Sequence, residues 1–556
     1  MSNFKPEAHE NTNRFVARIA TALLAPVVAL AFVGCTPEGE LHVHEETEMD
    51  PHEHMMDRQD HMMDPQEHMR EHEHGIVDFP ISCNDEAQVE FETALGHLHH
   101  MMYEQARPHF EAAAEADPDC AMAHWGIAMT SFQPLWHPTS PEDLERGKAA
   151  IERAHELDAP TDRERAYIAA ADAFFTDPEP ALDSRAEDHE ARVQAWKTAQ
   201  RELHEEYSED VDAAAFYALA EVSYAQTQFS PHRERDYTRQ LRAGEIMEDF
   251  LQEYPEHPGL FHYLIHAYDS PQLAHRAEEV AREYDKLAPD TVHALHMPSH
   301  IFVRLGHWEE TAEWNERSAA AALRDMDEDF HATAHYVHAL DYMMYAYLQM
   351  DELEKAQETL QRVQEVDELW GASFAAYNTA APQARYYLEQ QKWEGAAALE
   401  PRQPDVIDWD DFPAGEALFY YARGVGAARI GDLDQAEQEI AELERRVQTL
   451  RDDGDAYWAY MTEALAKAVE AWTLHERGET EQALALMSEA ADLEDSMDKH
   501  PTTPGEVLPV RELYGELLLE TGRHDEARQA FEASLERTPN RRYAQQGLEW
   551  VAGAGR

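Results

Sequence analysis

The chain has 556 residues, of which 112 are acidic and 45 are basic, and its formal net charge at pH 7 is −67. This charge excludes unaided binding to nucleic acid phosphates or to anionic lipid, because both would be repelled. Hydrophobic residues make up 43% of the chain, which is enough for packed cores, so the acidity belongs to a solvated surface. Such acidity is typical of proteins in salty surroundings (halophilic), and an ordinary acidic surface is the alternative.

The first predicted element is an export signal over residues 1–34. An almost wholly apolar run, Ile19 to Val33, follows Arg14 and Arg18. The run is too short to span a bilayer comfortably, which favours a cleaved signal peptide over a membrane anchor.

The residues that end this run resemble a bacterial lipobox. Small residues precede Cys35, although Phe32 stands where that pattern prefers leucine. The resemblance implies that Cys35 carries lipid. Because Thr36 follows, it also implies a protein held at the outer membrane, facing the periplasm or the exterior. An ordinary signal peptide without lipid is the alternative.

Residues 35–78 are predicted to be a disordered tether, because they are polar and too poor in apolar residues to bury a core. Histidine and methionine recur together here. The repeated positions are His54, Met55, Met56, His61, Met62, Met63, His68 and Met69. Imidazole suits copper(II) and zinc, and thioether selects copper(I), so the tether is predicted to collect metal. A polar spacer without metal is the alternative.

From residue 79 onward the pattern is helical, and the prolines and glycines that separate the predicted helices recur. Pro289 lies 34 residues after Pro255, and glycine recurs in the turns between predicted helices. These turn glycines are Gly306, Gly431, Gly478 and Gly522. The period and the turns resemble tetratricopeptide repeat proteins, which implies an all-α fold, a curved solenoid of helix pairs with a concave groove.

The array is predicted to have two parts. Residues 79–400 form an amino-terminal array with a histidine-lined groove, residues 401–415 form a Pro- and Asp-rich linker, and residues 416–556 form a carboxy-terminal array. The segment Asn540 to Ala552 is predicted to be the capping helix of the last repeat.

Three longer strings resemble a bacterial subfamily of tetratricopeptide proteins that has no firmly assigned activity. They are DCAMAHWG at residues 119–126, HYLIHAYD at residues 262–269 and HMPSHIF at residues 296–302. This resemblance implies no mechanism.

Histidines and aspartates occupy the positions that line the groove in tetratricopeptide repeats. In three successive repeats these are His262, His266, Asp269, His293, His296, His300, His338 and Asp341. Residues three or four apart share one face of a helix, so the set predicts a copper or zinc site. Contact with a peptide or small anion, and a purely structural network, are the alternatives.

Pro298 falls inside one of these helices and is expected to kink or restart it, which separates His293 and His296 from His300.

Once Cys35 is assigned to lipid, two cysteines remain, Cys83 and Cys120. An oxidising compartment lets a disulfide persist, so we predict that these two are joined.

Three functions remain open. The first is an exported, lipid-anchored protein whose groove and tether bind copper or zinc. The second is a non-catalytic scaffold whose groove binds an extended peptide or a partner helix without metal. The third is a metal-dependent hydrolase with Asp269 or Asp341 as the base. The sequence contains no phosphate-binding loop, nucleophile elbow or His-Glu-x-x-His helix, so it indicates no standard enzyme class.

Overall fold

The computed structural model describes residues 74–135, 138–178, 185–228, 236–326, 330–371 and 373–554. The predicted export signal, Cys35 and the repeated His/Met positions of the tether lie outside the described residues. All regular secondary structure in the described ranges is helical, so the predicted all-α fold is confirmed. None of the described helices is long and apolar enough to cross a membrane.

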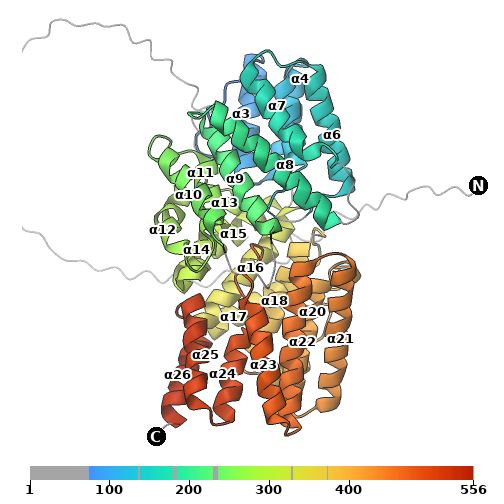
Figure 1. Cartoon of the computed structure of the whole chain (residues 1–556), viewed down its shortest axis with the longest axis vertical. Helices are drawn as coiled ribbons and strands as arrows, with labels where there is room; N and C mark the ends of the chain where they lie inside the picture. The colour runs from blue at the N-terminus through green and yellow to red at the C-terminus, as the bar shows by residue number, and fades with distance from the viewer. Residues whose placement is uncertain are drawn as a thin grey trace, which may run out of the picture. The chain divides into compact units, whose positions relative to one another are not determined.

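The helices follow one another along the chain as stacked pairs (Figure 1). The first helices of the pairs are α3 (Asp85–His99), α5 (Ala121–Thr130), α7 (Asp162–Phe175), α9 (Val211–Thr227), α11 (Pro258–Tyr268), α13 (Val292–His296) with α14 (Pro298–Leu305), α16 (Ala332–Gln349), α18 (Ser373–Leu388), α20 (Pro413–Ile430), α22 (Ala456–Glu476) and α24 (Val510–Glu520). The second helices are α4 (Tyr103–Ala116), α6 (Pro141–Glu156), α8 (Arg185–Glu206), α10 (Thr238–Leu251), α12 (Ala274–Glu283), α15 (Trp308–Asp325), α17 (Leu353–Gln364), α19 (Trp393–Ala397), α21 (Leu433–Asp452), α23 (Thr480–Asp495) and α25 (His524–Arg537). Two short 3-10 helices, η1 (Tyr284–Lys286) and η2 (Trp409–Asp411), and a last helix, α26 (Arg542–Ala554), complete the described chain.

The predicted turn glycines have the backbone conformation that short helix–helix turns require. Gly306, Gly431, Gly478 and Gly522 all have a positive φ between 69° and 83°. A residue with a Cβ is strained in this left-handed region, so glycine lets each first helix end there. At Gly306 a Cβ would also overlap the carbonyl of Pro539.

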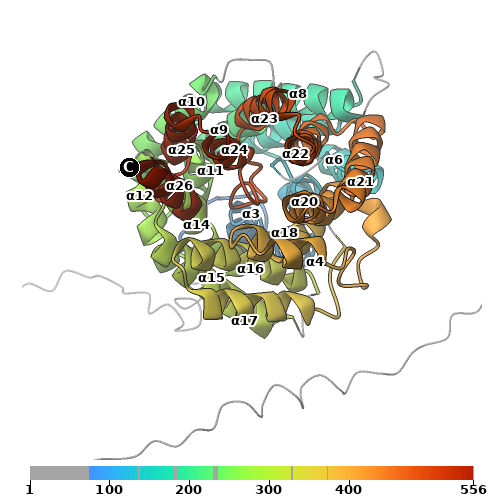
Figure 2. The same cartoon turned by 90° about the horizontal axis from the view of Figure 1, so that it is seen from below.

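The two helices of a pair differ in how much of their surface they bury. Nearly every side chain of α16 is buried, whereas α17 buries Ala356, Thr359, Leu360 and Val363, which share one face. Figure 2 shows α16 on the inner side of α17 and α20 on the inner side of α21. The inner layer is therefore made of first helices, and these carry the predicted groove histidines.

Helix packing continues across the predicted linker at residues 401–415. Both α18 and α19 pack against α20, and one apolar cluster extends from Ala376 to Val551. Within this segment Trp409 is buried, and its indole nitrogen donates to the carbonyl of Pro404 at 3.1 Å.

The carboxy-terminal helices contact the repeats that carry the histidines, within one compact unit, Met63–Arg556. The helix α26 packs against α25 and α16. The indole nitrogen of Trp308 donates to the carbonyl of Asn540 at 3.0 Å, and the guanidinium of Arg541 donates to the hydroxyl of Tyr345 at 2.8 Å. The last repeat therefore supports the helices that form the groove.

Candidate metal centre

Three successive first helices present histidines to the same part of the interior. Pro258 begins α11, where its fixed φ suits the first helical position. Pro298 ends α13 and begins α14, as the sequence led us to expect, so His293 and His296 lie on α13 and His300 lies on α14. The third helix, α16, contributes His338.

These side chains form two groups of three, which we call triad A (His262, His266 and His293) and triad B (His296, His300 and His338). In each triad one ring nitrogen of every histidine lies within 4.8 Å of the other two. The Nε2 atoms of His262 and His266 are 3.1 Å apart, and those of His296 and His300 are 3.0 Å apart. The rings of His266 and His300, 5.8 Å apart between centroids, join the two triads.

Burial keeps these imidazoles neutral. It lowers the pKa of His262 to about 3, and it also lowers the pKa of every other histidine of the two triads. Neutral imidazole is the form that binds a metal ion.

Fixed oxygen atoms determine which ring nitrogen carries the proton in two of these histidines. The Nδ1 of His262 lies 2.6 Å from the carbonyl oxygen of His99, which can only accept, so this nitrogen donates. The Nδ1 of His296 lies 2.7 Å from Oδ1 of Asn315. Asn315 donates through its Nδ2 to the carbonyl of Thr311, so its oxygen is the atom that faces His296.

Asp269 lies behind His300 and belongs to neither triad. Its Oδ2 is 3.0 Å from Nδ1 of His300 and 2.6 Å from Nζ of Lys499, and its Oδ1 is 2.8 Å from Nε of Arg304. Burial opposes ionisation, but Lys499 and Arg304 outweigh it and hold the pKa of Asp269 well below its usual range. Asp269 is therefore ionised, and it orients His300 as a partner behind a ligand does.

Asp341 lies toward Arg385 and in none of the possible ligand groups of the described chain. Its Oδ1 is 3.5 Å from Nε of Arg385, and both side chains are fully buried. Burial raises the pKa of Asp341 to about 6, although Arg385 acts in the opposite direction. The predicted set thus separates into six histidines that come together, one carboxylate that orients His300, and one carboxylate that faces Arg385 and belongs to neither triad.

A third group, which sequence reasoning missed, consists of His99, Asp212 and His257. The Nε2 atoms of His99 and His257 lie 2.8 and 3.2 Å from Oδ1 of Asp212. His257 caps α11 by accepting the N–H of Leu260 at its Nδ1, so its Nε2 carries the proton that Asp212 accepts. Every close contact here has a proton to share, which makes this group a hydrogen-bonded structural network. Its members lie on separate elements, and no spacing in the sequence links them.

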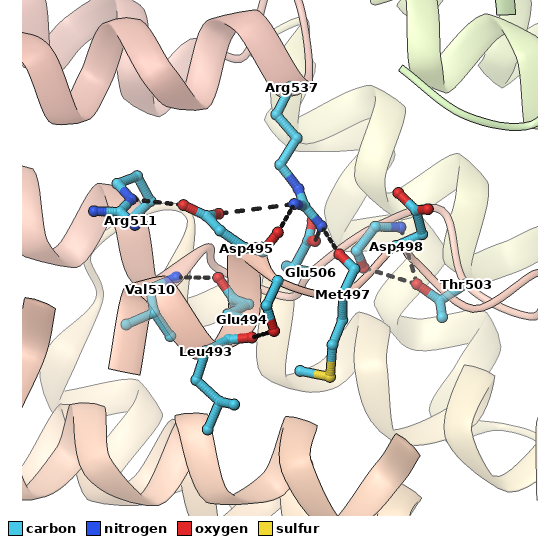
Figure 3. Close-up of polar contacts among 12 residues, drawn as sticks. Leu493, Glu494, Asp495, Met497, Asp498, Thr503, Glu506, Val510, Arg511 and Arg537 are labelled. Atoms are coloured by element: carbon cyan, nitrogen blue, oxygen red, sulfur yellow. Dashed lines mark hydrogen bonds and ion pairs between the residues drawn. The ribbon is translucent and has the colours of Figure 1, made fainter. Parts of the chain in front are cut away.

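A loop of this chain fills the groove over the triads. The groove loop, residues 496–509, connects α23 to α24, and Figure 3 shows the polar contacts at its base. Arg537 donates to the carbonyls of Asp495 and Met497 and to the carboxylate of Glu506. Arg385 donates to the carbonyls of Gly505, Glu506 and Val507. The groove is therefore occupied by an internal segment, which nothing in the repeat pattern predicts.

Two cavities adjoin the histidines. A small cavity of about 20 Å³ lies between the triads and is lined by His266, His293, His300, His335, His338, Phe374, Pro501 and Thr502. It has room for about one water molecule. A larger cavity of about 360 Å³ reaches His266 and Asp269 from the side of α9, α10 and the groove loop. This larger cavity gives an entry path to the histidines.

Cys83 and Cys120 form a disulfide bond in the structure, with a sulfur–sulfur distance of 2.06 Å. Cys83 precedes the N-cap of α3 and Cys120 is the N-cap of α5, so the bond joins the starts of two neighbouring first helices.

In sequence, a tetratricopeptide repeat family matches residues 509–541, which cover α24, α25 and their turn. The chain therefore contains a tetratricopeptide repeat at its carboxy-terminal end. No curated protein is significantly similar to it in sequence.

Solved structures of helical repeat proteins share the arrangement at low similarity. Cut9, from the crystal structure of the APC/C hetero-tetramer Cut9-Hcn1, is 10% identical, with a TM-score of 0.36 and coverage of 84% of this chain and 76% of that chain. Yeast Tom70 is 11% identical, with a TM-score of 0.32 and coverage of 84% and 95%. Human IFIT1, solved as a dimer with m7Gppp-AAAA, is 12% identical, with a TM-score of 0.34 and coverage of 77% and 84%. No functional conclusion follows from similarities this low.

Proposed function

We propose that this protein binds a transition metal ion, copper or zinc, through the buried histidines of its groove. Three neutral imidazoles whose ring nitrogens can bind the same ion are a common ligand set for copper and zinc. The partners behind the ligands fit as well, because His262, His296 and His300 each offer Nδ1 to an oxygen acceptor.

The observation that carries the proposal is the contact between His296 and His300. Each ring uses Nδ1 as a donor, His296 to Asn315 and His300 to the ionised Asp269. In a neutral ring the other nitrogen then has a lone pair and no proton. The two Nε2 atoms nevertheless face each other at 3.0 Å. Two lone pairs at this distance repel each other unless a cation lies between them, and a metal ion is such a cation.

A proton is the competing cation, because a protonated His300 could donate to His296. Burial lowers the pKa of both rings. Asp269 acts in the opposite direction on His300, but burial, together with the cationic Lys499 and Arg304, outweighs it, so the pKa of His300 is also lowered. A metal ion is therefore the better fit at neutral pH.

Metal content tests the proposal. The background is the full chain in which every histidine and methionine of residues 41–73 is replaced by serine, which removes metal bound by the tether. We expect this chain to retain copper or zinc after dialysis, and we expect His296→Gln/His338→Gln to reduce the bound metal by about one ion per chain. His275→Gln, at an exposed histidine on α12, is the matched control and should leave the content unchanged. Equal content in all three chains would show that triad B holds no ion, and the argument from the contact between His296 and His300 would then be refuted.

We also propose that the protein is exported and held at a membrane by lipid on Cys35, with the tether delivering metal to the groove. The support is the sequence of residues 1–35 and the repeated histidine and methionine positions. Cys35→Ser should release the full chain from the membrane fraction of cells that produce it. Unchanged partition between membrane and soluble fractions would contradict the anchor.

A scaffold that binds a protein partner without metal is the second candidate, and the repeat at residues 509–541 favours it. The groove loop lies where a bound peptide would lie, so a partner would have to displace it or use another surface. Absence of metal from the background chain, with full folding, is the result that would favour this candidate.

A further inference from the structure

The two triads are neighbours, and the space between them is shared. His266 and His293 of triad A and His300 and His338 of triad B all line the 20 Å³ cavity. The ring centroids of His262 and His293 are 5.0 Å apart, and those of His296 and His338 are 4.1 Å apart. The rings of each triad therefore surround a separate position for an ion. Two ions in these positions would both face the small cavity.

Triad A has the same kind of support as triad B. The carbonyl of His99 fixes the proton of His262 on Nδ1, so the Nε2 of His262 offers a lone pair toward His266. His266 also lines the larger cavity, through which an ion can reach it. Triad A therefore has a fixed ligand and an entry path.

The charges around the triads favour an ion of low charge. All six ligands are neutral, and the two buried carboxylates on the same helices are already paired, Asp269 with Lys499 and Arg304 and Asp341 with Arg385. A buried ion that no anionic ligand neutralises is costly, and the cost rises steeply with its charge. Copper(I) carries one charge, whereas zinc always carries two. Imidazole is a usual ligand of copper, so a site made only of histidines fits this ion.

We propose that triads A and B hold a pair of copper ions, one in each triad, and that the small cavity between them takes a bridging water or hydroxide. This inference rests on the proposed metal-binding function and extends it from one ion to two. A bridging hydroxide would neutralise part of the extra charge when both ions are oxidised to copper(II). The cavity has room for about one ligand of that size.

The experiment uses the background chain defined above, loaded anaerobically with copper(I) and dialysed. We expect two copper ions per chain. After each ion has given one electron to ferricyanide, we expect an electron paramagnetic resonance signal well below two spins per chain, because a shared bridge couples the two copper(II) ions.

Two variants separate the sites. His262→Gln/His266→Gln removes ligands of triad A, and His296→Gln/His338→Gln removes ligands of triad B. Each should retain one copper ion, and its oxidised form should give a full single-spin signal, because the remaining ion has no partner. His275→Gln should behave as the background chain.

The possible failures are distinguishable. If the background chain binds one ion and only the triad B variant loses it, the metal-binding function stands and the pair does not. If the background chain binds two ions with a full two-spin signal, the shared bridge is refuted, and this result needs no variant that has to fold. If the background chain binds no copper, the proposed function itself fails.

Discussion

At the scale of single residues, the position of a proton distinguishes a ligand group from a structural network. The groups around Asp212 and around His296 both bring nitrogen and oxygen atoms within 3.2 Å of one another. Around Asp212 each contact has a donor and an acceptor. Between His296 and His300 both nitrogens are acceptors, because Asn315 and Asp269 occupy the donor side of each ring. This contrast is the reason why we propose a metal ion for the groove and not for His99 and His257.

Asp269→Asn tests the role of the orienting carboxylate. The substitution leaves Lys499 and Arg304 buried without an anion, so we expect the free energy of unfolding to fall by about 3–5 kcal/mol. His300 also loses the carboxylate that holds its ring, so metal affinity should fall by about 10–100-fold. Urea denaturation of the full chain and metal titration of the background chain, each with and without the substitution, measure the two effects.

The matched control for this prediction is Asp290→Asn. Asp290 also pairs with an arginine, Arg324, but its side chain is 81% exposed. Exposed pairs of this kind contribute little, so both quantities should stay close to those of the parent. If Asp269→Asn behaves like this control, the carboxylate does not orient His300.

The repeat pattern predicts which residues line the groove but not what they face. His262, His266, His296 and His300 follow from helical spacing, because the repeat fixes the inner face of each first helix. Lys499, by contrast, lies 230 residues from Asp269 in the sequence, and no local sequence pattern predicts a pair over such a separation. Nor does the pattern predict that Asp269 pairs with Lys499 and Arg304 or that Asp341 faces Arg385, because these partners come from other repeats.

At the scale of helices, a break in one element affects how two of the candidate ligands, His296 and His300, are placed. Pro298 has no N–H to continue α13, so α14 begins there and Met297 is shared by the two caps. His296 and His300 are still four residues apart, and their rings meet at 85°. Proline therefore restarts the helix without removing either histidine from the groove. The sequence predicts that the helix breaks at Pro298, but it does not predict how the rings of His296 and His300 are oriented relative to each other.

The disulfide at the amino-terminal end should stabilise the first repeats. The bond between Cys83 and Cys120 closes a loop with a sequence separation of 37 residues. Loop-closure entropy of the unfolded chain then predicts a contribution of about 4 kcal/mol. Cys83→Ser/Cys120→Ser should lower the free energy of unfolding by this amount in urea denaturation. A midpoint equal to that of the oxidised parent would contradict the prediction.

The segment before α3 should dock in a pH-dependent way. We call residues 74–81 the strap: the N–H of Ile76 donates to the carbonyl of Glu256 at 2.9 Å, and the ring of His74 packs 4.1 Å from that of His97. Burial, and then the charge of His109, lowers the pKa of His74 to about 4. The rings of His97 and His100 and the hydroxyl of Thr291 also face His74.

The sign of this effect follows from the two pKa values of His74. A free strap takes up a proton below about pH 6.5, whereas the docked strap resists it until about pH 4. Docking is therefore full above pH 6.5 and weakens by about 1.4 kcal/mol per pH unit as pH falls toward 4. Amide-exchange protection of Ile76 should decrease from pH 7.5 to pH 5.0, and His74→Gln should make the decrease smaller. Equal pH dependence in the two chains would exclude His74 as the cause.

At the scale of the whole molecule, the carboxy-terminal repeats close the site that the middle repeats build. The groove loop brings Pro501 and Thr502 to the small cavity and Lys499 to Asp269. Arg385 and Arg537 hold the loop from two different repeats. Apart from the carboxylate of Glu506, the atoms that they bind are backbone carbonyl oxygens, which every residue has, so the identity of the loop residues does not reveal these contacts. This explains why the sequence predicts an open groove, whereas the structure has a filled one. On the proposed function, an ion bound to the triads would leave when the loop moves or through the larger cavity beside it.

Lys499→Gln should therefore accelerate metal release without weakening metal binding. The substitution removes a buried ion pair that holds the groove loop closed, so the loop opens more often, and each 1.4 kcal/mol lost from closure gives about a tenfold faster release. It also removes a positive charge near the ions, so affinity at equilibrium should stay equal or rise. A lost ligand would lower affinity instead. Stopped-flow transfer of copper to a chelator measures the rate and a competition titration measures the affinity, with Lys286→Gln, at an exposed lysine, as the control. If Lys499→Gln and the control release metal at the same rate, the groove loop does not gate the site.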